Sequence, residues 1–442
     1  MTPETPNSAA PDGRFEPMAL RDRLVDLGRA HGLAEVGVCD ASPFDAERRI
    51  LEQRRNEGLN ADMAFTYRNP ARSTDPSRAL AGARSMIVGA YRYDTSLPSA
   101  PSRAAARVAR YATEDHYARL RAALGAIARE LRDHGHRALV VADDNAMVDR
   151  AVAVRAGIGW YGKNSNVLLP GQGSWFVLGS VITDAALSPT GAPLEDGCGS
   201  CTRCIEGCPT AAIVAPGVVD ARRCLAWHLQ ATGDFPREFR AALGDRIYGC
   251  DECQEVCPPS RRADARTPDL ADPSDAELAP STTPSTAPST TPGNAPGTWV
   301  DLDWLLSAQD EELMATVGRW YIPKRESRYV RRNALVVLGN SVDLVDTDAR
   351  PSDPAAPRID PDRIAGLLAV YLDGEDEMLA AHATWAALRL GRIDLVEAGG
   401  RRDRPAIAAE VAAHTSFVAA DDGLATGPDV LRLAGSGDDG AT

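Results

Sequence analysis

The stretch Cys198-Gly-Ser-Cys201-Thr-Arg-Cys204-Ile-Glu-Gly-Cys208-Pro209 decides the architecture of this chain. Its cysteines follow the spacing C-x₂-C-x₂-C-x₃-C-P, which is typical of proteins that hold iron–sulfur clusters through thiolates. In proteins with two such clusters, the fourth cysteine of the run binds the other cluster. The stretch therefore predicts a pair of neighbouring [4Fe-4S] clusters, whose remaining ligands must come from elsewhere in the chain.

A second cysteine stretch supplies those ligands. The run Cys250-Asp-Glu-Cys253-Gln-Glu-Val-Cys257-Pro258 has the second half of the same pattern but lacks one leading cysteine, which Cys224 can replace. Four cysteines from the first stretch, three from the second and Cys224 make eight ligands, four for each cluster. We assign one cluster to Cys198, Cys201, Cys204 and Cys257, and the other to Cys208, Cys224, Cys250 and Cys253.

Two zinc sites are the alternative, because four-cysteine zinc sites also use C-x₂-C pairs. Three consecutive short spacings followed by Cys-Pro, in matched copies, are poor zinc geometry and favour clusters. Cys39 is the ninth cysteine, and we expect it to be a small buried hydrophobic residue. In a cytosolic chain, this cysteine content indicates metal or redox chemistry rather than disulfides.

Length and composition allow two or three globular domains. The chain has 442 residues, of which 44% are hydrophobic and 25% charged, as in ordinary globular proteins. The first twenty residues have neither a basic start nor an apolar run, and no apolar window reaches the length of a membrane span. We therefore expect a soluble, cytoplasmic monomer without membrane contact. A net charge of -14 means that any contact with nucleic acid must be local.

Residues 17–187 alternate helical and strand patterns, which predicts an α/β domain. Strands are expected at 35–39, 85–91 and 138–142, and helices at 119–134 and 146–156. Asp143 follows the last strand, at the end where ligands usually bind in open α/β sheets. The glycine-rich segment 157–179 either brings the backbone close to a large ligand or simply packs against the sheet. It matches no nucleotide-binding fingerprint.

The rest of the chain has a different character. A Pro/Ser/Thr-rich stretch is expected to be a linker, and helical patterns at 329–338, 363–372 and 378–390 suggest a small module of the HEAT type. The predicted units are a disordered lead at 1–16, the α/β domain at 17–187, the two-cluster domain at 188–260, the linker at 261–299, the helical module at 300–420 and a disordered tail at 421–442.

Several runs resemble epoxyqueuosine reductases, a family of cobalamin-dependent iron–sulfur enzymes of queuosine synthesis in tRNA. The resemblance covers about residues 19–260 and 300–395. It is carried by the eight-cysteine pattern and by GIGWYGKN at 157–164, GSWFVLG at 173–179, DARRCLAW at 220–227, DRIYGCDECQEVCP at 245–258, and the C-terminal RRNA at 331–334 and LGNS at 338–341.

The resemblance implies a fold and a reaction. The fold is an α/β N-terminal cobalamin-binding domain, a ferredoxin-like α+β two-[4Fe-4S] domain and an α-helical HEAT-like C-terminal module. The reaction is reduction of epoxyqueuosine to queuosine at the wobble position of the tRNA anticodon loop. An external low-potential donor feeds the clusters, and the clusters feed cobalamin.

The resemblance also implies site residues. Asp143 matches the family's proton donor, and a desolvated carboxyl at that place can stay protonated, as an acid catalyst must. The implied cobalamin contacts are Tyr67, Arg110, Lys163, Asn164, Val167, Ser174, Leu178 and Asp251.

Other interpretations stay open at this point. Asp143 is alternatively a helix cap, although Asp144 and Asn145 would fill that role better. The chain is alternatively a dehalogenase-like cobalamin reductase or a ferredoxin-type electron carrier. Segment 319–332 has six Arg or Lys and one acid, which indicates either a phosphate-binding surface for tRNA or a solvated helix face.

Overall fold

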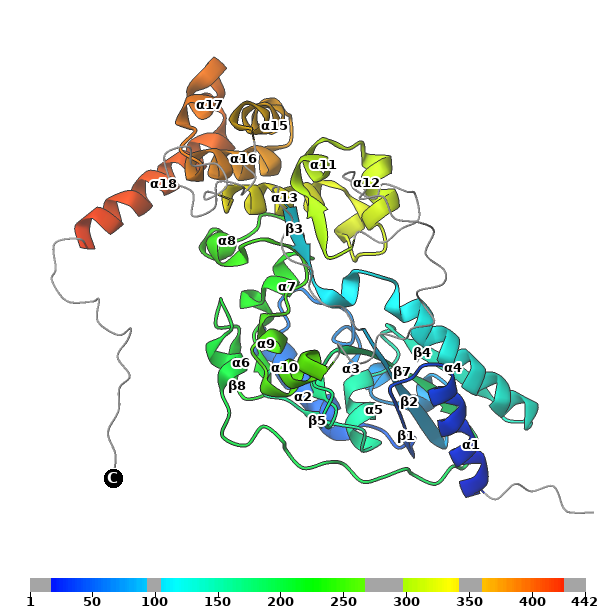
Figure 1. Cartoon of the computed structure of the whole chain (residues 1–442). Helices are drawn as coiled ribbons and strands as arrows, with labels where there is room; N and C mark the ends of the chain where they lie inside the picture. Colours follow the sequence, from blue (N-terminus) through cyan, green and yellow to red (C-terminus); the bar gives the residue numbers. More distant parts are fainter. Residues whose placement is uncertain (1–16, 94–104, 267–296, 342–359, 425–442) are drawn as a thin grey trace, which may run out of the picture.

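The computed structural model describes residues 17–93, 105–266, 297–341 and 360–424 (Figure 1). The predictions of disorder at 1–16 and of a linker at 267–296 lie outside this part. At its edges the linker is shorter than predicted, because a helix continues to Arg266 and a strand begins at Trp299. The tail prediction is wrong for residues 421–424, which belong to the last helix. No helix in the described ranges is long and apolar enough to cross a membrane.

A four-stranded sheet forms the N-terminal part of the molecule. Its spatial order is β1 (Glu35–Asp40), β2 (Ser85–Arg92), β7 (Phe176–Thr183) and β4 (Ala138–Ala142). Each pair of neighbours is antiparallel. The three predicted strands are confirmed, but β7 was not predicted and lies between two of them. The rule on ligand sites in parallel sheets therefore does not apply here.

Helices cover both faces of this sheet, because its side chains are apolar on both. On one face, Val38 and Ile87 pack with Leu124 of α4 (His116–Asp133) and with α1 (Pro17–Ala30). On the other face, Met86 packs with α5 (Asp149–Arg155), and Cys39 is buried there as expected. The remaining short elements here are α2 (Asp45–Asn56), α3 (Pro70–Ser73), β5 (Trp160–Tyr161), β6 (Val167–Leu168) and the 3₁₀ turns η1 (Pro76–Arg78) and η2 (Arg110–Ala112).

The cysteine-bearing segment is built of short pieces. Two of its helices, α6 and α9, carry one cysteine each, Cys204 and Cys253, and contact one another. The elements are α6 (Arg203–Glu206), β8 (Ile213–Ala215), β9 (Val218–Val219), η3 (Ala221–Arg223), α7 (Leu225–His228), α8 (Arg237–Leu243), α9 (Glu252–Glu255) and α10 (Pro258–Arg266).

The C-terminal part is helical, and α16 lies at its centre against α13, α15 and α18 (Figure 1). All three helices predicted there are confirmed. The elements are α11 (Leu302–Ser307), α12 (Asp310–Val317), η6 (Pro323–Arg325), α13 (Arg328–Gly339), α15 (Pro361–Asp373), α16 (Glu377–Arg389), α17 (Ile393–Glu397), η7 (Ala398–Asp403) and α18 (Pro405–Leu424).

A second sheet joins all three parts. Strand β3 (Ala105–Val108) pairs in parallel with β10 (Arg246–Tyr248) and antiparallel with β11 (Trp299–Asp301). One hydrophobic core also runs from β3 through the cysteine segment into the C-terminal helices. The predicted domain boundaries therefore do not separate independent cores, because the hydrophobic packing continues across them.

Candidate functional site

The structure brings Cys198, Cys201, Cys204 and Cys257 together, and we call these the first thiol set. Burial raises the pKa of the Cys204 thiol, and the nearby thiols of the other three members raise it further. Burial likewise raises the pKa of Cys257, while hydrogen bonds from Ser260 lower it and the charges of Cys198 and Cys201 raise it. The chain around this set, at Gly199 and Ser200, is exposed.

Cys208, Cys224, Cys250 and Cys253 form the second thiol set. Burial raises the pKa of Cys253 well above its ordinary value, and the other three thiols add to the effect. Burial also raises the pKa of Cys250 to about 12. The sulfur of Cys208 accepts a hydrogen bond of 3.2 Å from the Ala212 amide. About 210 Å³ of empty space lies beside Cys250.

This arrangement suits clusters better than single ions. Zinc ligand sulfurs must all lie about 2.3 Å from one ion. Among the described residues, which include all eight thiols, no three His, Cys, Asp or Glu side chains are placed to hold one metal ion. A cubane spreads its four ligands around a larger body, so the two sets of four fit [4Fe-4S] clusters.

Asp143 lies in the loop between β4 and α5 and has an unusual backbone. Its φ is +54°, a left-handed conformation that is strained for most residues other than glycine and is often found at functional sites. The residue is exposed to solvent. The surrounding protein still desolvates it enough to raise its pKa, although the charge of Arg121 acts in the opposite direction.

Asp143 is not a helix cap. The residue that caps α5 is Val148, which makes no side-chain capping bond. The neighbouring Asp144 instead accepts a hydrogen bond of 2.8 Å from the Ala146 amide. The structure therefore removes the capping interpretation of Asp143 and leaves its carboxyl available for chemistry.

Two further titratable residues interact electrostatically with Asp143, and neither was predicted from the sequence. Burial raises the pKa of Tyr117, and the charges of Asp143 and Asp149 raise it further. Asp149 begins α5, and burial together with Asp143 raises its pKa well above the ordinary value. Its Oδ1 atom is buried without a hydrogen-bond partner in the described part of the chain. An acid in the first turn of a helix is so common that its sequence position was uninformative.

Three of the predicted cofactor contacts tie the N-terminal part to the cysteine segment. The Lys163 ammonium donates to the Gly199 carbonyl at 2.7 Å. The Asn164 amide donates to the carbonyl of Cys253 at 3.1 Å. The Ser174 hydroxyl donates to the Gln254 side chain at 2.9 Å. These polar side chains hold the backbone on which both thiol sets depend.

Arg110 and Asp251 form a buried link of the same kind. The Asp251 carboxylate accepts a 2.7 Å hydrogen bond from the backbone amide of Arg110. Burial raises the pKa of Asp251 to about 6. The Arg110 guanidinium pairs with Asp264 at 2.9 Å and lies 4.0 Å from the centre of the Trp175 ring.

The other predicted contacts are packed within the protein. Val167 is 3% exposed in the same core as the partly buried Leu178. Tyr67 is half-buried, and its carbonyl accepts a hydrogen bond from Arg55. The structure does not by itself assign these three residues to a ligand.

The dense glycines of 157–179 serve packing. A Cβ on Gly159 would lie 2.5 Å from the Leu168 carbonyl oxygen, and one on Gly173 would lie 2.5 Å from Cα of Ser260. The structure therefore favours the packing interpretation of this segment over close approach to a ligand.

The basic segment 319–332 is only partly a surface. Arg332 is fully buried and donates to the carbonyls of His228, Ala231 and Gly233. Arg328 and Arg331 pair with acids, Asp376 and Asp310 respectively. These three arginines hold α13 in place, so for them the structure favours a structural role over both a phosphate-binding surface and a solvated helix face. The side chains of Arg319, Lys324 and Arg325 remain exposed.

Comparison with known proteins agrees with the cysteine pattern. A family model described as a 4Fe-4S double cluster binding domain matches residues 197–260. The epoxyqueuosine reductase of Bacillus anthracis is 36% identical over 255 residues, which cover 55% of this chain and 66% of that protein. Those of Shewanella oneidensis and Vibrio cholerae are 31% and 32% identical over 367 residues, which cover 78% and 80% of this chain and 85% and 88% of those proteins.

Solved structures extend the comparison. A crystal structure of epoxyqueuosine reductase with a tRNA-Tyr epoxyqueuosine-modified tRNA stem loop is 27% identical, with a TM-score of 0.69 over 84% of this chain and 90% of that one. The epoxyqueuosine reductase from Streptococcus thermophilus, at 24% identity, shares the fold with a TM-score of 0.71 over 91% of this chain and 100% of that one. Because two relatives above 30% identity are matched over more than four-fifths of their length, this chain belongs to the epoxyqueuosine reductase family of oxidoreductases.

Proposed function

We propose that this protein reduces epoxyqueuosine to queuosine at the wobble position of tRNA. The observation that carries the proposal is that Tyr248 connects Asp143 with the second thiol set. Tyr248 lies within electrostatic reach of Asp143 and stands two residues before Cys250 of the second thiol set. The carboxyl with the raised pKa and the second set of cluster ligands therefore both lie in the neighbourhood of Tyr248.

The reaction needs both parts. Converting the epoxide to an alkene takes up two electrons and two protons and releases the oxygen as water. Asp143 gives the first proton to that oxygen, and solvent, to which this residue is exposed, supplies the second. Because burial raises the pKa of Asp143, the carboxyl keeps its proton to a higher pH than an ordinary aspartate, as a general acid requires.

The two thiol sets hold the electron carriers. Two [4Fe-4S] clusters, when bound, supply electrons one at a time. The first thiol set has exposed chain around it, so the cluster that it would hold is the one open to an external low-potential donor. The cluster on the second set would supply electrons to the substrate site, where Asp143 supplies a proton. Because the substrate is on tRNA, the proposed reaction takes place in the cytoplasm. The proposed enzyme is a monomer that does not contact a membrane.

Cobalamin is the proposed third cofactor. Its support is the family resemblance together with a group of buried polar atoms in the N-terminal part of the molecule. Within the described residues, Arg110 Nε, Trp175 Nε1 and His116 Nε2 are buried without hydrogen-bond partners. The ring of Tyr93 lies 6.1 Å from that of Trp175 and 5.5 Å from that of His116, so these atoms belong to one group. Unpaired buried polar atoms suit the amide-fringed corrin, which would supply a low-potential metal for reducing a carbon–oxygen bond.

Anaerobic reconstitution tests the proposal. We expect about eight iron and eight sulfide per chain, one corrinoid per chain, and conversion of an epoxyqueuosine-containing stem-loop in a single turnover. Electron paramagnetic resonance should show two reducible clusters. A ferredoxin-type carrier would bind no corrinoid and convert nothing. Tightly bound zinc without iron–sulfur absorption would overturn the redox assignment.

A further inference from the structure

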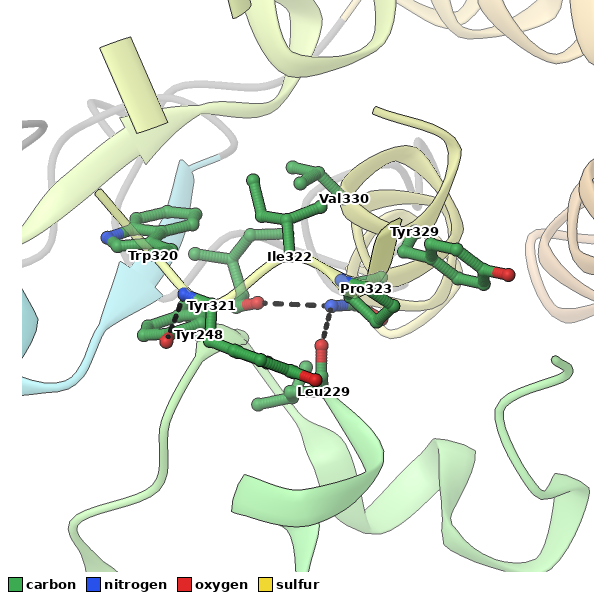
Figure 2. A pocket seen from close by; sticks show the side chains of 10 residues that line it. Leu229, Tyr248, Trp320, Tyr321, Ile322, Pro323, Tyr329 and Val330 are labelled. Carbon is green, nitrogen blue, oxygen red and sulfur yellow. Dashed lines mark hydrogen bonds between the residues drawn. The ribbon is translucent and has the colours of Figure 1, made fainter. Parts of the chain in front are cut away.

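An exposed tyrosine stands on the loop between α12 and α13. Figure 2 shows this loop against Tyr248. Trp320 is 4% exposed and stacks on the Tyr248 ring, with centroids 4.7 Å apart and planes 8° from parallel. The next residue, Tyr321, is 63% exposed, and its backbone amide donates to the Tyr248 hydroxyl at 2.8 Å.

The loop is held so that the Tyr321 ring must point outward. Trp320 and Ile322 on either side are 4% and 5% exposed. Because alternate side chains of an extended segment point to opposite sides, burying these two forces Tyr321 into solvent. Lys324 and Arg325 follow with φ of +51° and +60°. Two successive left-handed residues other than glycine are uncommon and form a fixed turn.

Positive charge surrounds this ring. Arg319, Lys324 and Arg325 are exposed. Arg325 donates to the Gly318 carbonyl, and neither Arg319 nor Lys324 has an ion pair with an acid in the part of the chain that the structure describes. In a protein of net charge -14, such a local group of cations favours a polyanion.

Tyr248 links this loop to the surroundings of the proposed acid. The hydroxyl of Tyr248 interacts electrostatically with both Tyr321 and Asp143. A polymer that places one nucleoside at Asp143 would therefore have its neighbouring nucleotides within reach of Tyr321.

We infer that Tyr321 is a stacking platform for an unpaired base next to the modified nucleoside, with Arg319 and Lys324 on the flanking phosphates. The inference rests on the proposed function and names the contact that selects its substrate. A flat aromatic ring in a basic setting binds unstacked bases of single-stranded loops, whereas bases inside a duplex are already stacked. The partner is therefore the open anticodon loop rather than a helical stem.

Binding of an unmodified anticodon stem-loop tests the inference without any turnover. We expect Tyr321→Ala to weaken binding roughly 5- to 100-fold, the usual effect of losing one stacked base. Tyr321→Phe keeps the ring and should bind as wild type. Val370→Ala is the matched control, because Val370 is a 66% exposed side chain on another helix of the same part. Lys324→Gln should also flatten the salt dependence of binding by about one phosphate contact.

A blunt RNA duplex of equal length separates stacking from charge. Its affinity should not change in Tyr321→Ala. Equal weakening for duplex and stem-loop, or unchanged stem-loop affinity in Tyr321→Ala at an unchanged melting temperature, would overturn the inference. Failure of the proposed function looks different: wild-type protein would bind the stem-loop in a Tyr321-dependent way and yet leave epoxyqueuosine unreduced.

Discussion

The two thiol sets have the same ligand count but different surroundings. The first set lies among exposed residues such as Gly199 and Ser200. The second lies beside the buried Asp251 and Tyr248, and burial raises the pKa of Cys250 to about 12. Sequence spacing makes the two sets near copies, whereas the fold leaves exposed chain around the first set and surrounds the second with buried side chains. We propose that this difference gives electron transfer a direction, from the surface inward.

The largest expected effect comes from removing a cluster. Cys224→Ala should lose the second cluster, leave about four iron atoms per chain, and abolish turnover with any reductant. Cys204→Ala should lose the first cluster, with turnover surviving only when a small chemical reductant replaces a protein donor. Iron analysis measures the loss of each cluster, and turnover assays with a protein donor and with a small chemical reductant measure its effect on activity. Cys39→Ser is the control and should keep both clusters. Equal residual turnover in Cys224→Ala and Cys204→Ala would contradict the inward direction.

Asp143 carries the next effect. Asp143→Ala should keep both clusters while single-turnover reduction falls roughly 10²- to 10⁴-fold, the usual value of a positioned general acid. Asp144→Ala is the control, because it removes a neighbouring charge whose carboxylate instead accepts from Ala146. Unchanged turnover in Asp143→Ala would assign the proton to another group, of which Asp149 is the nearest candidate.

A smaller effect concerns pH. An acid catalyst works only while protonated, so the single-turnover rate should fall as pH rises through the pKa of Asp143. Arg121 lowers that pKa, and Arg121→Gln should therefore raise it and move the fall in rate to higher pH. Arg121→Lys keeps the charge and should leave the profile in place. A shift to lower pH in Arg121→Gln would refute the assignment of the titrating group.

The smallest expected effect is on stability, and it compares the hydrogen bonds that hold the backbone beside each thiol set. Asn164→Ala leaves the Cys253 carbonyl without its donor, and a lost buried hydrogen bond lowers stability by about 1 kcal/mol or more. In a chain of this length we expect the thermal midpoint to drop by about 1–2 °C. Lys163→Met, which breaks the corresponding bond to Gly199 in more exposed surroundings, should change it less. The reverse order would show that the first set is the more firmly held.

The sequence was informative wherever the pattern is local. Cysteine spacing identifies which thiols share a set, because short loops fix the distances between neighbouring ligands. Asp143 was proposed as the proton donor from the family resemblance, at a position between a strand signal and a helix signal, and the structure confirms both of these elements. Helical periodicity located α13, α15 and α16 for the same reason.

The features that could not be predicted from the sequence depend on contacts between distant segments of the chain. Strand β7 joins β2 and β4, but it was missed because it begins within a glycine-rich segment that was interpreted as a loop. Arg332 lies in a run of cations, and only the fold shows that it binds carbonyls of the cysteine segment instead of phosphate. The role of Tyr321 likewise depends on Tyr248, a residue far away in sequence.

The sheet formed by β3, β10 and β11 has a consequence for biosynthesis. During synthesis, β3 emerges from the ribosome long before β11. The edge of β3 that pairs with β11 therefore stays unpaired until Asp301 has emerged. Such distant pairing slows folding and exposes edges that favour aggregation. All eight cluster cysteines emerge before β11 does. Loading of iron and sulfide can therefore precede closure of this sheet, and a shortage of either during synthesis should show up as misfolded protein as well as inactive enzyme.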